Sequence, residues 1–506
     1  MAQGLWERAR LSPKAAEGLH FMQVRGMGFK RLDSINTLLR NKVVFLKTTT
    51  GVPPRTMQTT RGTRTSTMGI RTTTIGTTKT GSGLYGVLDK PVPEKGEEPH
   101  PAPFCNYTQL ELFPSCLISL EQVFEAYYSC RKHKRKTREA MAFEVDLEEN
   151  LIELWKELND GTYMVGRSTV FIVQQPVVRE IFAASFRDRI VHHLIINALN
   201  PVIEKRLVHD VYACREGKGS HLAVERLDHF MRSCSCNYQR EGWVLKLDIR
   251  SFFMSIDKHL LFDAFSAYIR DSYFEHDREL LLQLCRLVVF NDPTHDCIFR
   301  SPAYSWGMLP KDKSLFHARQ GCGLPIGNLT SQVLANFYLS PLDYYIKHDL
   351  GIRFYGRYVD DFVLVHESRA YLSECVILIR QFLQDRLYLT LHPKKIRLQR
   401  ISEGVSFLGW SLQVGHINGG NRCIRNWRKV IERENLLIGD HRPTREERLA
   451  FRSSMNSYLG ILAHHDTYRV RYRILGTLDQ RWSSFFRLDF RIRKMVVNRV
   501  LKKMEQ

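Results

Sequence analysis

Three aspartates at the ends of two strand-like segments have the residue type and spacing for chemistry. Asp248 lies near the end of residues 243–249, where four apolar side chains alternate with other types and fall on one face of a strand, so Asp248 belongs to the other face. Asp360 and Asp361 stand between aromatic and β-branched residues, which predicts a β-hairpin with both acids at its tip. Taken singly, each feature has an ordinary structural interpretation: a helix cap for Asp248 and an inert turn for the Asp-Asp pair.

Three carboxylates on two strand ends predict a site for two Mg²⁺ ions, with Mn²⁺ as the alternative ion. Mg²⁺ takes oxygen ligands and keeps positions for water and substrate phosphates. Two such ions about 3.5–4 Å apart can hold the attacking and leaving oxygens of an in-line phosphoryl displacement. Two adjacent acids at a tight turn also repel each other, and a bound cation would relieve that repulsion. The expected chemistry is transfer of a phosphoryl group from a triphosphate to a hydroxyl.

A glycine-rich segment lies between the two acidic motifs. Residues 321–332 read Gly-Cys-Gly-Leu-Pro-Ile-Gly-Asn-Leu-Thr-Ser-Gln, and the apolar stretch 333–339 follows. The glycines allow close backbone approach to a base pair, and the next helix is expected to pack behind it. In this order, the Asp248 motif, the glycine-rich segment and the Asp360-Asp361 motif resemble the palm of reverse transcriptases.

The resemblance implies a role for each residue around the aspartates. Asp248 and Asp360 match the principal metal ligands, Asp361 matches the third acid, and the carbonyl of Ile249 matches a backbone ligand. Phe253 matches the aromatic steric gate that excludes a ribose 2′-hydroxyl. The alternative is that Phe253 is an ordinary core aromatic. The spacing between Phe253 and Asp248 favours the steric gate over this alternative.

The same resemblance extends to the flanks of the palm. Arg179 resembles the fingers residue that grips the incoming triphosphate, and Lys395 resembles the lysine proposed to protonate the leaving pyrophosphate, a catalytic role. Ile326 stands beside the incoming nucleotide, where most reverse transcriptases carry Gln. The remaining residues expected at the substrate are Arg187, Gly327 and Gln332.

Nucleic-acid contacts are expected from a hairpin and from the basic C-terminal region. Residues 407–410 resemble the primer-grip hairpin. Within residues 422–429, basic side chains are expected to meet phosphates, with Trp427 either packed beneath them or stacked. The residues predicted to bind nucleic acid are Arg215, Lys218, Gly409, Trp410, Arg425, Arg428 and Lys429.

Further motifs point to a subclass. The markers are residues 212–215 with 217–221, residues 326–332, and residues 457–460 with 468–469. They most resemble reverse transcriptases of diversity-generating retroelements, within the group II intron and retron-like bacterial enzymes. Such enzymes copy a template-repeat RNA, miscopying adenines, and usually work with a small basic accessory protein that forms a pentamer.

The partners that the resemblance implies are template RNA, the RNA/cDNA duplex, dNTPs and that accessory protein. Two alternatives stay open. One lies within the same class: a defence-associated, retron-like or intron-type reverse transcriptase. The other lies in a different class: a non-catalytic RNA-binding protein that kept the fold, although the intact acids and gate argue against it.

Charge and composition suggest the domain organisation. The chain has 506 residues and a net charge of +21; residues 1–90 and 411–506 each carry +11, whereas residues 91–410 carry −1. A neutral body between two basic ends suggests an anionic partner held from the flanks. The expected fold is α+β, a right-hand polymerase with fingers and an antiparallel-sheet palm over 118–410 and a basic helical thumb over 411–506.

The N-terminal extension, residues 1–117, is expected to be disordered and basic. Residues 41–80 hold 15 threonines in neither a helical nor a strand period, and a proline-containing linker follows. Two interpretations stay open for the first 90 residues. One is template-repeat DNA translated from a start codon assigned too far upstream, and the other is a basic arm that binds RNA.

Local patterns predict where order begins. Ser119 with Gln122 is a capping-box signature, leucines at helical spacing over 147–158 end at Gly161, residues 170–173 suggest a strand, and 188–206 suggest a helix. Eleven scattered cysteines without a CxxC motif predict reduced thiols. No signal-peptide pattern and no run of 18 apolar residues occur, so we expect a cytoplasmic protein without a membrane segment.

Overall fold

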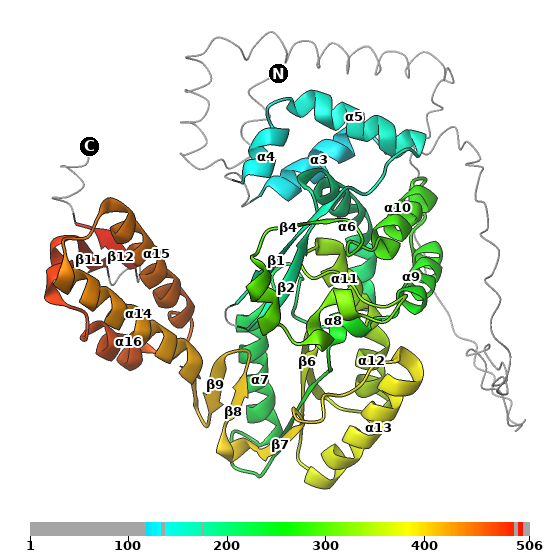
Figure 1. Cartoon of the computed structure of the whole chain (residues 1–506). Helices are drawn as coiled ribbons and strands as arrows, with labels where there is room; N and C mark the ends of the chain where they lie inside the picture. The colour runs from blue at the N-terminus through cyan, green and yellow to red at the C-terminus, as the bar shows by residue number, and fades with distance from the viewer. Residues whose placement is uncertain (1–117, 133–136, 175–176, 490–493, 499–506) are drawn as a thin grey trace, which may run out of the picture. The chain divides into compact units, whose positions relative to one another are not determined.

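The computed structural model describes residues 118–132, 137–174, 177–489 and 494–498, all within the unit Phe104–Gln506 (Figure 1). The Thr-rich extension predicted over residues 1–117, with both of its interpretations, lies outside the described residues. Among the described helices, none combines the length and the apolar character needed to cross a membrane.

The sheet that carries the aspartates has four antiparallel strands in the order β5-β6-β3-β7. The antiparallel palm sheet expected from the sequence is therefore confirmed. The register pairs Asp248 with Asp361, so the two acidic motifs meet at one end of the sheet. The strands are β3 (Trp243–Asp248), β5 (Phe354–Tyr358), β6 (Asp361–His366) and β7 (Arg397–Arg400).

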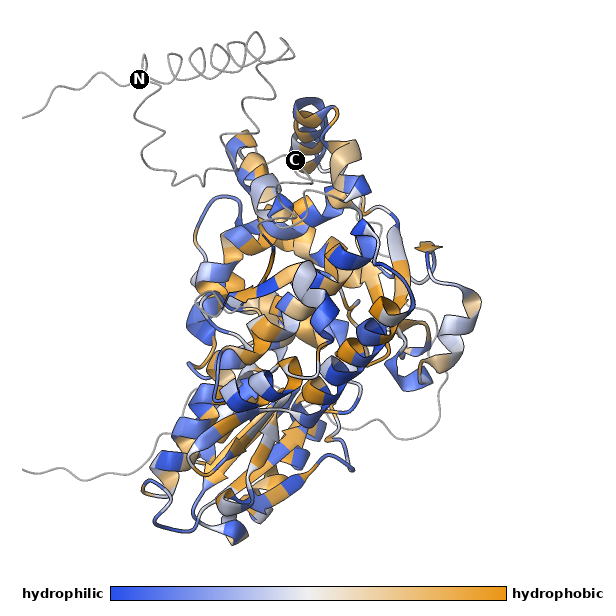
Figure 2. Ribbon diagram, turned by 90° about the vertical axis from the view of Figure 1, so that its left-hand side faces the viewer, coloured by the Kyte–Doolittle hydropathy of each residue, from blue (hydrophilic) through white to orange (hydrophobic). Residues whose placement is uncertain are grey.

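Both faces of this sheet are buried, whereas the sequence predicted one apolar face. Leu245 and Leu247 pack into the main core, while Val244 and Val363 pack into a second cluster that includes helix α7 (Ser220–Cys234). Figure 2 shows strands rich in apolar residues between helices that mix both types. The helices that contribute to the main core include α6 (Phe186–Arg206), α9 (Lys258–Ser272), α10 (Arg278–Phe290), α11 (Leu329–Tyr338), α12 (Ser340–Tyr344) and α13 (Arg369–Leu387), and the short α8 (Phe252–Ser255) follows β3.

A second sheet, β2-β1-β4, belongs to the region expected to form the fingers. The pair β1–β2 is antiparallel and the pair β1–β4 is parallel. The predicted capping box of Ser119 and Gln122 is confirmed, and Gly161, with φ 70°, ends α5 as predicted. The elements are α3 (Leu120–Arg131), α4 (Arg138–Phe143), α5 (Leu147–Asp160), β1 (Ser168–Val173), β2 (Arg179–Ala183) and β4 (Cys297–Phe299).

The sequence analysis predicted no helix or strand for the segment between α10 and the glycine-rich motif. It contains β4 and three short 3₁₀ turns, Ala303–Met308, Lys311–Lys313 and Leu315–His317. The buried carboxylate of Glu180 accepts hydrogen bonds from the Ser314 hydroxyl and the Leu315 amide, both at 2.7 Å. This acid therefore ties the segment to β2, next to Arg179.

The C-terminal part differs from the expected helical thumb in two ways. First, a three-stranded sheet, β10-β9-β8, includes residues on both sides of the predicted boundary at residue 410. The Gly420 amide, just after this sheet, donates to the Gly409 carbonyl at 2.9 Å. Second, two antiparallel strands follow the helices. The elements are β8 (Val405–Phe407), β9 (Trp410–Gln413), β10 (His416–Gly419), α14 (Asn421–Asp440), α15 (Arg445–Leu462), α16 (Tyr468–Leu475), β11 (Phe486–Asp489) and β12 (Lys494–Val497).

Candidate active site

The acidic hairpin turns through two residues, Val359 and Asp360, between the paired Tyr358 and Asp361. Val359 has φ 57°, a left-handed conformation that is unfavourable for a β-branched residue. The tip with both acids agrees with the prediction, but the strained valine needs support from its surroundings.

That support comes from Arg357, which the sequence analysis missed. Its guanidinium is 0% exposed, donates to the Val359 carbonyl at 3.0 Å and forms an ion pair with Asp343 of α12 at 2.7 Å. It also donates to the side-chain oxygen of Asn336 at 3.1 Å. Arg357 thus links two helices to the turn that presents the acids, and no local pattern reveals this because its partners lie 14 and 21 residues away.

The three carboxylates lie where the ends of β3 and β6 meet. The Ile249 amide donates to the Asp360 carbonyl at 3.3 Å, which fixes the hairpin tip against the end of β3. One side-chain oxygen of Asp248 and one of Asp361 are buried and lack a hydrogen-bond partner among the described residues. Burying a charged oxygen without a partner is costly, so these two atoms mark where a cation would be favourable.

Burial and mutual repulsion also make the ionised form of these acids unfavourable. Burial, followed by the charge of Asp248, raises the pKa of Asp360 to about 6. Burial likewise raises the pKa of Asp361, although the ammonium of Lys246 opposes the shift. Raised carboxylate pKa values are expected where several acids await a counter-charge.

The arrangement fits Mg²⁺ as an open site. In the described part of the chain, no three His, Cys, Asp or Glu side chains, the three aspartates included, already lie close enough together to hold a metal ion. Mg²⁺ typically binds through one or two carboxylates and completes its shell with water and substrate phosphates. Asp248, Asp360, Asp361 and the carbonyl of Ile249 are the groups that would hold it.

Two lysines stand beside the carboxylates. Lys395, from the loop after α13, donates to Asp248 at 2.7 Å, and the His392 amide pins that loop by donating to the Asp248 carbonyl at 2.8 Å. Lys246 lies 3.2 Å from Asp361, donates to the Ser406 carbonyl at 3.4 Å, and sits 5.5 Å from the ring centroid of Phe407.

Lys246 was not among the predicted site residues. The signal was available, because a residue two positions before Asp248 on a strand shares its face. The contacts of Lys246 join Asp361 to the hairpin that resembles the primer grip.

A cavity of about 390 Å³ opens over the acids. It gathers eight of the residues predicted from the sequence and adds others from the 291–320 segment, the Lys395 loop and the β8–β9 hairpin. The predicted residues that line it are Arg179, Asp248, Ile249, Phe253, Ile326, Asp360, Asp361 and Lys395. The additional residues include Arg250, Asp312, Lys313, His392 and Leu408.

The glycine-rich loop is joined directly to strand β2. The Phe182 amide donates to the Ile326 carbonyl at 2.8 Å, and Ile326 lines the cavity. Gly327 has φ 129°, and a Cβ there would lie 2.7 Å from the Phe182 carbonyl oxygen, so only glycine fits. Gly327 itself does not line the cavity.

Among the other predicted residues outside the cavity lining, four have partners within the chain. The guanidinium of Arg187 pairs with Glu157 of α5. Gln332 accepts a hydrogen bond from the Cys214 thiol at 2.8 Å. The other two are Arg215 and Lys218, which were expected at nucleic acid.

Arg215 differs most from its predicted role. Its side chain is 8% exposed, pairs with Glu204 at 2.7 Å, and donates to the carbonyls of Val208 and Val211 at 2.8 and 3.0 Å. The Lys218 ammonium donates to the His209 carbonyl, and burial lowers its pKa. These cations satisfy local backbone carbonyls, which leaves Arg215 with few donors for a phosphate.

The β8–β9 hairpin turns through Leu408 and Gly409, with φ values of 47° and 85°, as a two-residue hairpin prefers. Leu408 reaches the cavity lining, whereas Trp410 is buried with its ring edge-on to His465 at 4.4 Å. Trp410 therefore packs the base of the hairpin.

On α14 the structure decides between the two expectations for Trp427, which is packed and not exposed for stacking. Trp427 is fully buried, with its indole N–H directed to the sulfur of Met455 at 3.2 Å. The side chains on the outer part of the helix are exposed: Arg425, Arg428 and Lys429.

Comparisons with known proteins agree with this geometry. Residues 177–412 match the family described as reverse transcriptase (RNA-dependent DNA polymerase). Protein YkfC of Escherichia coli K12 is 24% identical over 271 residues, an alignment that covers 46% of this chain and 63% of YkfC.

Two telomerase structures are also similar, at 9% identity and a TM-score of 0.37 each. The alignment with the apo Candida tropicalis enzyme, truncated from its C-terminal domain, covers 50% of this chain and 55% of that chain. The alignment with the Candida albicans enzyme, in complex with a TWJ fragment of telomeric RNA, covers 62% of this chain and 60% of that chain. Both TM-scores are low.

Proposed function

We propose that this chain, whose residues 177–412 match the reverse transcriptase family, copies RNA into DNA by nucleotidyl transfer at Asp248, Asp360 and Asp361. The observation that carries the proposal is the pair of buried carboxylate oxygens, on Asp248 and Asp361, that lack partners in the described residues and lie in a cavity with Arg179. When bound there, two Mg²⁺ ions would activate the attacking hydroxyl and stabilise the leaving pyrophosphate.

The cavity residues have complementary tasks. The guanidinium of Arg179 is exposed at the start of β2, where it can pair with a triphosphate. Phe253 forms an aromatic wall of the same cavity, where it would exclude a ribose 2′-hydroxyl. Lys395 can release Asp248 when cations arrive and direct its ammonium to the leaving phosphate oxygen, supplying a proton.

RNA-templated primer extension tests this function. Wild type with Mg²⁺ is expected to extend a DNA primer on an RNA template, whereas Asp360→Ala with Asp361→Ala should give no product. Binding of the primer–template should persist, because the exposed cations of α14 are untouched. Substantial extension by the double variant would overturn the catalytic assignment, and RNA binding without extension by wild type would favour the non-catalytic RNA-binding alternative.

The finer proposal is an error-prone enzyme of the diversity-generating type, acting in mutagenic retrohoming with a small basic pentameric accessory protein. Ile326 supports it, since an aliphatic side chain lines the cavity where a hydrogen-bonding Gln is usual in the family. Without that hydrogen bond, correct and incorrect nucleotides should differ less in transition-state binding.

Sequencing cDNA made by wild type and by Ile326→Gln on one RNA tests this subclass. The substitution is expected to reduce misincorporation opposite template adenine more than opposite other bases. An unchanged error spectrum would favour a defence-associated, retron-like or intron-type enzyme.

A further inference from the structure

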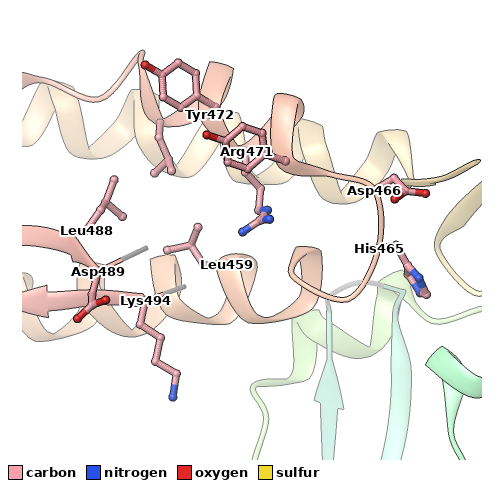
Figure 3. A pocket seen from close by; sticks show the side chains of 10 residues that line it. Leu459, His465, Asp466, Arg471, Tyr472, Leu488, Asp489 and Lys494 are labelled. Atoms are coloured by element: carbon pink, nitrogen blue, oxygen red, sulfur yellow. The ribbon is translucent and has the colours of Figure 1, made fainter. Parts of the chain in front are cut away.

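A second cavity, of about 470 Å³, lies in the C-terminal region and shares no lining residue with the cavity over the aspartates. It is formed by α15, α16 and the strands β11 and β12 (Figure 3). Its apolar wall consists of Leu459, Leu475 and Leu488. A cavity of this volume is large enough for a small ligand or one nucleotide.

Two tyrosines of α16 form its rim. Tyr468 and Tyr472 are four residues apart, so they lie on one side of the helix, and each is 64% exposed. Their ring centroids are 6.3 Å apart and their planes differ by 22°. A flat base between two rings needs about 7 Å, twice the roughly 3.4 Å repeat of stacked nucleotides in a strand. A small rotation of either exposed ring would therefore admit one base.

Helix α16, which forms the rim, is basic. Helix α16 reads Tyr-Arg-Val-Arg-Tyr-Arg-Ile-Leu, with three arginines and no acid. Arg471 and Lys494 line the cavity, and in Figure 3 the Arg471 side chain extends from α16 into the space between the helices. Two acids also line the cavity and balance these two cations: Asp466, which accepts a hydrogen bond from the Ile417 amide at 3.4 Å, and Asp489 at the end of β11.

We propose that this pocket captures one unpaired nucleobase of a single-stranded nucleic acid. Tyr468 and Tyr472 stack on the base, the leucine wall packs against its edge, and the basic side chains of α16, together with Lys494, meet the flanking phosphates. Only an unpaired base can enter, because bases within a duplex are already stacked. Three arginines on one short helix select a polyanion over an apolar peptide.

Fluorescence anisotropy with the full chain measures this directly. The probes are a labelled, unstructured single-stranded RNA, a DNA of the same sequence, and a blunt RNA/DNA duplex. EDTA is present and dNTPs are absent, so the outcome does not depend on polymerisation at the aspartates. Whichever of the two single strands, RNA or DNA, binds with the higher affinity identifies whether template or product occupies the pocket.

The expected result is selective loss of single-strand binding. Tyr468→Ala with Tyr472→Ala should weaken it about tenfold, the size of one lost base–aromatic stack, and leave duplex binding unchanged. Tyr468→Phe with Tyr472→Phe should bind as wild type, since the rings remain. Tyr128→Ala is the matched control, because Tyr128 is 62% exposed on α3, outside this cavity.

Three results would overturn the proposal: wild-type affinity in the double alanine variant, an equal loss with the duplex probe, or phenylalanine variants as weak as the alanine variants. Because both tyrosines are largely exposed, the variants should melt at the wild-type temperature. Equal melting temperatures would confirm that the affinity change reports on the pocket.

Discussion

In the region of the acidic site, which the sequence predicts to be the palm, Arg357 and Asp343 are completely buried against each other. On α14, in the region that the sequence predicts to be the thumb, Arg425 and Arg428 are exposed to solvent. The palm uses few charges, each with fixed partners, to hold the acids in one geometry. The thumb presents many cations on a helix that is packed through Trp427. Losing a palm charge should therefore disrupt structure or chemistry, while losing a thumb charge should only weaken a salt-dependent attraction.

The largest effect is expected at Arg357. Arg357→Met leaves the Asp343 carboxylate buried without its partner and removes the donor to the Val359 carbonyl. Breaking such a pair costs about 3–5 kcal/mol of unfolding free energy. Urea denaturation of the variant measures this. A loss below about 1 kcal/mol would mean that the pair does not hold the palm.

The matched control is Arg357→Met combined with Asp343→Leu. Replacing a whole buried ion pair with apolar residues is often close to neutral, so the double variant should recover most of the lost stability. Recovered stability without recovered primer extension would show that Arg357 also positions the turn.

The next effect concerns pH. The folded-state pKa of Asp360 is raised to about 6, above its unfolded value of roughly 3.9. Protonation is then favoured in the folded state, so this contribution to stability is complete below pH ~4 and is lost as the pH rises through about 6. In EDTA, wild type should lose about 1–3 kcal/mol across this window, the lower end reflecting partial exposure of the side chain.

Asp360→Asn is the control for the pH effect, because it cannot titrate. The difference in unfolding free energy between wild type and this variant should shrink or reverse between pH 4 and 6.5. A difference that is independent of pH would place the titration elsewhere. Mg²⁺ should bind more tightly above pH 6, since it needs the deprotonated acid.

A smaller effect is expected at Lys246. Lys246→Met removes the counter-charge of Asp361 and the link to the Ser406 carbonyl, so single-nucleotide incorporation should slow about tenfold through misplacement of the acid and hairpin. Lys246→Arg keeps the charge and should retain most of the rate. Equal rates for wild type and Lys246→Met would show that Lys246 does not contribute to nucleotide incorporation.

The smallest effects belong to the thumb. Arg425→Ala, Arg428→Ala and Lys429→Ala should each lower RNA affinity only a few-fold and reduce the slope of log affinity against log salt by about one. Binding isotherms over a salt series measure both quantities. A variant that loses affinity without a change in slope would have lost something other than a phosphate contact.

Features set by local pattern could be predicted from the sequence. The acidic hairpin, the period-two placement of Asp248 and the capping box at Ser119 depend on neighbouring residues, and the structure has each of them. Lys246 could have been found by the same period-two argument, because it shares the strand face of Asp248.

Features set by distant partners could not be predicted. Arg357 is specified by Asp343 and Asn336, and the role of Arg215 depends on backbone carbonyls whose positions appear only in the fold. A cation such as Arg215, close to Gly217 and Gly219 in the sequence, therefore gave the same sequence signal whether it faced phosphate or the chain itself. The strands after α16 also escaped prediction, because each is only four residues long.

Single-turnover incorporation of one dNTP, at saturating RNA template and DNA primer, tests the central claim most directly. It compares wild type with Asp248→Asn and with the combined Arg425→Ala, Arg428→Ala and Lys429→Ala variant. Saturation removes the contribution of binding, so the thumb variant should react within a few-fold of wild type, while Asp248→Asn should give no detectable product. Incorporation by Asp248→Asn at a rate close to wild type would contradict the assignment of chemistry to the palm carboxylates.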